Sequence, residues 1–222
     1  MTSLWLRALA WCSLGVGFVC AGWIVNDVFG RGHRQPMRVM EAVWPLTALY
    51  LGPVAIWAYR RFGRVDAMRS RMARRPRWAG IAISVTHCGA GCVLGDIIAE
   101  FALFGLGASI AGQTLYAEYA GDYPVAIAFG VAFQYFVISR MRRLTLGTGL
   151  AAAVKSDFVA LTAFEVGLFG WMALMRFVFF DPPLHPSSPV YWLFMQLGMV
   201  LGFATSWPAN VWLINRGIKD AM

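Results

Sequence analysis

The chain has 222 residues, of which 59% are hydrophobic and only 14% are charged. Soluble domains are roughly half apolar and about a quarter charged, so this composition excludes an ordinary soluble domain and indicates an integral membrane protein. The net charge of +8 could indicate a nucleic-acid partner, but many of the basic residues lie in one stretch between two apolar segments. That placement is typical of a cytoplasmic loop in a membrane protein, so we expect no nucleic-acid binding.

Six apolar segments occur along the chain, at residues 5–25, 38–59, 78–106, 122–139, 157–180 and 189–214. A helix needs about 20 apolar residues to cross the hydrocarbon core, and lipid cannot satisfy an exposed backbone, so each segment predicts a spanning helix. The fold class is therefore predicted to be all-α, a polytopic transmembrane helix bundle of about six spans. We expect one integral membrane domain over residues 1–222, with the first span more peripheral than the others.

The third segment, 78–106, is long for one span, and its apolar run continues with interruptions to Tyr116. It predicts either one long helix or a tilted helix followed by a short re-entrant piece. The sequence alone leaves these two alternatives open.

The basic residues predict the orientation of the spans. Eight arginines lie between the second and third segments: Arg60, Arg61, Arg64, Arg69, Arg71, Arg74, Arg75 and Arg77. The positive-inside rule makes this loop cytoplasmic, and six spans then place both termini in the cytoplasm. Four acidic residues are expected in the outer loops: Asp27, Glu118, Asp122 and Asp181.

The third segment also carries the residues best suited to chemistry. Cys88, Cys92, Asp96 and Glu100 follow one another at intervals of four, so they share one face of a helix. Cys88 lies roughly 15 Å along the helix from Trp78, which is near the middle of a bilayer. Ionisable groups at that depth are costly and commonly functional.

Two thiols and an imidazole at this depth form a set of soft donors, His87, Cys88 and Cys92. Such donors suit Cu(I) or Zn(II), so the leading hypothesis is a protein that binds or transports a soft metal ion, or an accessory that handles one. Asp96 and Glu100, with Glu165 in the middle of the fifth segment, are predicted to line a polar pathway.

Two other functions fit the same residues. Gly91 and Gly95 form with the two cysteines a small-residue face suited to close helix packing. This face predicts a docking seam in a structural or assembly subunit without a ligand, joined to another membrane protein or to a second copy. A thiol redox protein is the weaker alternative, because Cys88 and Cys92 could approach disulfide distance only by distorting the helix. No nucleophile triad or dinucleotide motif is present, so an enzyme is not favoured.

Several motifs resemble a known family. They are Val43–Tyr50 (VWPLTALY), His87–Cys92 (HCGAGC) with Gly95-Asp96, Phe129–Phe136 (FGVAFQYF), Lys155–Asp157 with Leu161–Phe164, and Trp207–Asn210 with Gly217–Lys219. From residue 37 onward the chain resembles the bacterial polytopic membrane proteins known as domain of unknown function 4396. The resemblance implies a multi-pass protein of the bacterial inner membrane with its core at 37–222. It implies no activity, substrate or cofactor.

Overall fold

The computed structural model describes residues 3–64, 76–142 and 145–220, without the side chains of 139–142. The helices are α1 (Leu4–Val25), α2 (Met40–Leu51), α3 (Pro53–Ala58), α5 (Arg77–Leu106), α6 (Thr114–Arg142), α7 (Leu146–Leu174) and α8 (Pro189–Asn215). Wider π-helical turns extend α1, α3 and α7 at Asn26–Gly30, Tyr59–Gly63 and Met175–Phe179. The predicted all-α class is confirmed, since these ranges contain no β-strand.

Five helices in the described ranges are long and apolar enough to cross a membrane: Leu4–Gly30, Arg77–Leu106, Thr114–Ile138, Leu146–Phe179 and Pro189–Asn215. The prediction of a multi-pass helical protein is thus confirmed in outline, whereas the predicted number of six spans is not confirmed. Most of the predicted 60–77 loop, with Arg69, Arg71, Arg74 and Arg75, lies outside the described residues.

The predicted second span, 38–59, is a helical hairpin. The chain turns at Gly52, where φ is +52° and ψ is −126°, a conformation available to glycine, and α3 starts at the following proline. After the turn, Tyr59 Oη donates a hydrogen bond of 3.0 Å to Asp27 Oδ2, and Arg64 Nε lies 3.3 Å from the same carboxylate. Because Asp27 follows α1 directly, the hairpin leaves and returns at the same end of the bundle. An apolar run alone cannot distinguish this hairpin from a span.

The tip of the hairpin is held by α8. Pro53 has no N–H group, so the Leu49 carbonyl lacks its usual helical donor. Gln196 Nε2 donates to that carbonyl at 2.6 Å, and Ser13 Oγ of α1 donates to Gln196 Oε1 at 2.7 Å. One glutamine thus connects α1, α2 and α8 through a backbone group that would otherwise be unpaired.

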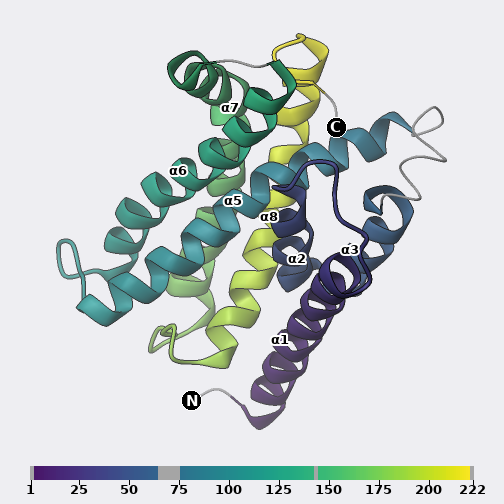
Figure 1. The fold of residues 1–222 in the computed structure, drawn as a ribbon. Coiled ribbons are helices and arrows are strands. Elements are labelled where there is room, and N and C mark those ends of the chain that lie inside the picture. Colours follow the sequence, from purple (N-terminus) through teal and green to yellow (C-terminus); the bar gives the residue numbers. More distant parts are fainter. Residues whose placement is uncertain (1–2, 65–75, 143–144, 221–222) are drawn as a thin grey trace.

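The two termini lie at opposite ends of the helix bundle (Figure 1). The N-terminus shares its end with the turns that follow α5 and α7, and the C-terminus lies with the starts of α5 and α7. The five candidate spans among the described residues are an odd number, so the predicted placement of both termini in the cytoplasm is not confirmed.

The 78–106 segment is a single helix, the first of the two predicted alternatives; it is capped at Gly107, whose φ of +61° is left-handed. The starts of the next two helices differ from the prediction. Of the apolar run that continues to Tyr116, residues 107–113 form the turn between the two helices, and α6 begins at Thr114. Both α6, from Thr114, and α7, from Leu146, begin earlier than the predicted segments at 122 and 157. Polar residues inside these helices lowered the local hydropathy. Glu118 and Asp122 therefore lie in α6, and their prediction as loop residues is wrong.

Close contacts between α5 and α6 build the centre of the bundle. A Cβ atom at Gly91 would collide with the Gly130 backbone, and one at Gly95 would collide with the Ala126 backbone. The small-residue face predicted as a docking seam is therefore covered by α6 of the same chain. This close approach also brings the polar face of α5 against α6.

We predict that Gly17→Val displaces the hairpin, because a Cβ atom at Gly17 would lie 2.7 Å from the Leu49 carbonyl oxygen. Overpacking of this kind costs about 1–3 kcal/mol, which a lower melting temperature in detergent micelles would record. The matched control is Gly15→Val on the same helix, where no heavy atom lies within 4 Å of the added Cβ. Equal melting temperatures for the two variants would contradict this packing.

Candidate functional site

His87, Cys88 and Cys92, predicted as metal ligands, all lie fully buried in α5. Neighbouring residues on a helix point about 100° apart, so His87 and Cys88 face different partners. The His87 ring lies edge-on to Phe133 of α6, with the ring centroids 6.4 Å apart, whereas Cys88 faces α7 and α8. Neither His87 ring nitrogen has a hydrogen-bond partner among the described residues.

These three residues do not converge on one point. Within residues 3–64, 76–142 and 145–220, no group of three or more His, Cys, Asp or Glu side chains is placed to hold a metal ion. The predicted Cu(I) or Zn(II) site therefore finds no support in the geometry. Cys88 and Cys92 are both free thiols, one helical turn apart.

Cys88 instead belongs to a cluster around the last lysine of the chain. Lys219 Nζ lies 2.5 Å from Asp157 Oδ1, 2.7 Å from Cys88 Sγ and 2.8 Å from Asn210 Oδ1. The side chains of Lys219 and Asp157 are both completely buried. We call these four residues the lysine cluster. It joins α5, α7, α8 and the C-terminal turn.

Four other carboxyl groups are buried in the same bundle. Asp96 and Glu100 come from α5, Asp122 from α6 and Glu165 from α7, and each residue is at most 1% exposed. We call these four residues the acidic column. Among the described residues, no Lys, Arg or His side chain lies within ion-pair distance of any of them.

The members of the acidic column are electrostatic neighbours. Asp96 interacts with Glu165, Asp122 and Glu100. One polar contact is short: Tyr191 Oη donates to Glu100 Oε1 at 2.5 Å. Glu100 also pairs with Asp122, and Glu165 pairs with the Cys92 thiol. The column is thus a connected set of acids whose neighbours among the described residues are other acids, one tyrosine and one thiol, none of them basic.

The column extends from the interior toward the end of the bundle that holds the N-terminus. Cys92 adjoins Glu165 and Asp96 at its inner end. At its outer end, Glu118 of α6 interacts with both Glu100 and Arg176. Arg176 Nη2 in turn donates to Gln113 Oε1 at 3.1 Å, in the turn before α6. Half-buried Glu118 and Arg176 therefore connect the buried acids to that end.

Asp96, Glu100 and Glu165, the residues predicted to line a polar pathway, thus lie beside one another; whether they conduct anything stays a prediction. Sequence reasoning missed Asp122, because it was placed in a loop, and it missed the lysine cluster. Asp157 and Lys219 are 62 residues apart in sequence, so no local pattern links them.

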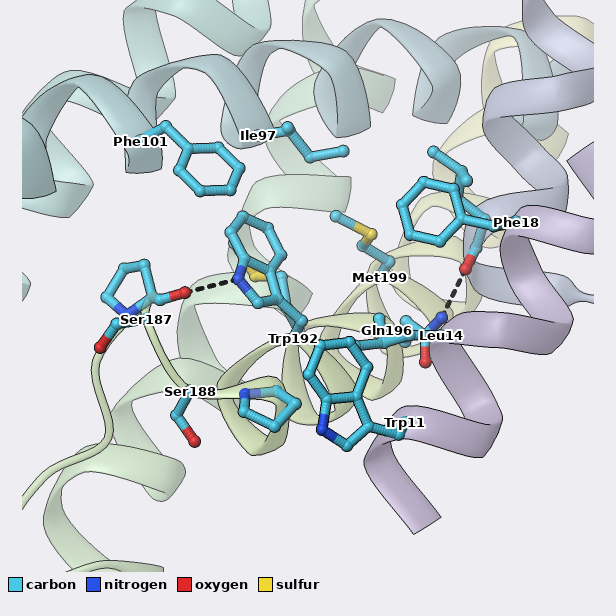
Figure 2. Close-up of a pocket in the computed structure, with 14 residues that line it drawn as sticks. Trp11, Leu14, Phe18, Ile97, Phe101, Ser187, Ser188, Trp192, Gln196 and Met199 are labelled. Atoms are coloured by element: carbon cyan, nitrogen blue, oxygen red, sulfur yellow. Dashed lines mark hydrogen bonds between the residues drawn. The ribbon is translucent and has the colours of Figure 1, made fainter. Parts of the chain in front are cut away.

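A separate apolar cavity of about 320 Å³ lies between α1, α5, α8 and the hairpin tip. Figure 2 shows Trp11 and Phe18 of α1, Ile97 and Phe101 of α5, and Trp192 of α8 around it. Its larger polar groups are already paired, since Trp192 Nε1 donates to the Pro186 carbonyl at 2.7 Å and Gln196 donates to α2. No residue of the acidic column or the lysine cluster lines this cavity.

Comparison with protein families identifies the class. The family model described as domain of unknown function (DUF4396) matches residues 77–219, well over half of the chain. The chain therefore belongs to the DUF4396 family, and the predicted resemblance is confirmed over this range. The match contains the whole acidic column and the whole lysine cluster, but neither α1 nor the hairpin. Searches of curated proteins and of solved structures found no match.

We predict that neutralising two buried acids has different effects on stability. Asp157→Asn leaves the Lys219 ammonium buried without its counter-ion, and breaking a buried ion pair by removing one partner costs about 3–5 kcal/mol. Glu165→Gln removes a carboxyl that has no basic partner in the described chain, so it should be neutral or stabilising. Melting temperatures of the purified variants in micelles provide the comparison. A larger loss for Glu165→Gln than for Asp157→Asn would show that these environments are misassigned.

Proposed function

We propose that this protein is a multi-pass membrane transport protein in which the acidic column relays protons through the α5–α8 bundle. One observation carries the proposal: Asp96, Glu100, Asp122 and Glu165 are fully buried neighbours without a basic partner among the described residues. Chains of buried carboxyl groups in membrane proteins typically mark proton relays and ion pathways.

The energetic argument concerns charge. An ionised carboxyl group inside a bilayer costs on the order of 3 kcal/mol on insertion scales, and adjacent negative charges repel each other as well. Four such groups therefore hold protons or share a cation. A proton needs only a series of neighbouring oxygen atoms, whereas a metal ion needs several ligands converging on one point. The acidic column forms such a series of neighbouring carboxyl groups, but its ligand atoms do not converge on one point.

The distribution of basic residues supports a specific orientation. Among the described residues, the basic residues in segments at the N-terminal end of the bundle are Arg7 and Arg176. The other described Lys and Arg residues belong to segments at the opposite end. With five crossings, the positive-inside rule places the C-terminus in the cytoplasm and the N-terminus outside. The Glu118 end of the column then faces the outside. The family resemblance favours the bacterial inner membrane.

The geometry gives less support to the other functions that the sequence suggested. Soft-metal handling requires convergent ligands, and the described residues contain no group of three or more His, Cys, Asp or Glu placed to hold a metal ion. The docking seam of an assembly subunit is occupied by α6. A thiol redox role rests only on the two free thiols, one turn apart.

Proton flux into proteoliposomes tests the proposal. A potassium diffusion potential is imposed with valinomycin, and an internal pH-sensitive dye records acidification. We expect the native protein to conduct protons faster than protein-free liposomes, and Asp96→Asn and Glu165→Gln to return the rate to that background. Each removes a protonatable link from the column.

The matched control is Asp181→Asn, which neutralises an exposed carboxyl between α7 and α8 and should leave the flux unchanged. Native flux equal to that of protein-free liposomes would overturn the proposal. Full flux in both column variants would overturn it as well.

A further inference from the structure

The lysine cluster has an unusual construction, because its cation comes from beyond the last helix. After α8, Gly217 adopts a φ of +65°, and the Ile218 N–H donates to the Leu213 carbonyl at 3.0 Å. This reversal folds the C-terminal turn back along α8. The Lys219 side chain consequently enters the bundle and is completely buried, although the neighbouring Asp220 is exposed.

Two of the three acceptors that surround the ammonium group, Asn210 and Cys88, are held by contacts independent of it. Asn210 Nδ2 donates to the Ser206 carbonyl and to Ser206 Oγ, at 3.0 and 3.1 Å, which directs Asn210 Oδ1 toward Lys219. Ser206 Oγ itself donates to the Ala160 carbonyl of α7 at 2.8 Å. Cys88 Sγ is positioned by a contact with the Ser84 carbonyl at 3.0 Å. These contacts preorganise the pocket.

We infer that Asp157, Asn210 and Cys88 form a binding site for a small monovalent cation of the ammonium type, which the chain fills with its own Lys219. One buried carboxylate matches one positive charge, and two further acceptors converge on the same point. Asp157 Oδ2 has no hydrogen-bond partner within the described residues, so the site has acceptor capacity that Lys219 does not use.

The Lys219 ammonium group can exchange with a cation from solution because it comes from the C-terminal turn. Lys219 lies beyond the end of α8, so the C-terminal turn can move without unwinding any of the long helices. The turn therefore acts as a plug at the end of the α5 polar face opposite Glu118. The inference goes beyond the proposed function, since cation binding at this site requires no flux through the acidic column.

Chemical rescue tests the site. In the full-length Lys219→Ala protein, we expect a lower melting temperature that ethylammonium chloride raises more than sodium chloride of equal ionic strength does. Ethylammonium supplies the missing ammonium group with a short apolar stem. The native protein and Lys155→Ala should show no such specific rise, because Lys155, the other lysine of the chain, is exposed.

Two results would overturn the inference: an ethylammonium effect no larger than that of sodium, or an equal effect in the Lys219→Ala/Asp157→Asn double variant, which lacks the carboxylate. If Lys219→Ala does not fold, the native protein supplies the test. Ethylammonium should then compete with Lys219 and accelerate tryptic release of the last three residues, measured by mass spectrometry. A release rate that sodium chloride changes as much as ethylammonium does would exclude a cation site.

Discussion

A buried charge surrounded by apolar helices needs a counter-ion, and two parts of this bundle meet that constraint differently. The lysine cluster meets it with an ion pair, in which Lys219 and Asp157 neutralise each other and Asn210 and Cys88 complete the hydrogen bonding. The acidic column has no counter-ion of this kind, since its four carboxyls have no basic partner among the described residues. Groups that the protein leaves unneutralised are the ones that a mobile cation can use.

Helix α5 organises both parts. Gly91 and Gly95 allow α6 to approach its backbone, which brings Asp96 beside Asp122. Cys88 lies on the same helix two turns before Asp96 and contacts α7 and α8. The two parts therefore occupy one polar face of one helix, and the family match contains all of that face. The hairpin and α1 lie outside the match and pack beside this unit.

Hydropathy predicts the spanning helices well because burial in lipid requires long apolar segments. It fails where one local feature changes the path of the chain, as at Gly52 and Pro53, which convert an apolar run into a hairpin. It also fails where a polar residue is neutralised by a distant partner. Asp157 marked the edge of a predicted span, yet Lys219 keeps it inside α7.

The candidate site was predictable only in part, for a similar reason. The spacing of Asp96 and Glu100 placed them on one face of α5, because helical periodicity is local. The packing of α6 and α7 against that face depends on tertiary contacts, which no pattern within one helix records. For His87, Cys88 and Cys92, the sequence pattern was misleading. His87 and Cys88 are adjacent in sequence, but in the helix they contact different partners.

The central claim is that the buried carboxyls hold protons that exchange with water. Infrared spectroscopy of the protein in lipid bilayers, during replacement of H₂O by D₂O, tests this claim directly. The account predicts carbonyl bands of protonated carboxyl groups that shift promptly in D₂O and lose intensity in Asp96→Asn and Glu165→Gln. Bands that keep their position in D₂O, or that persist unchanged in both variants, would contradict it.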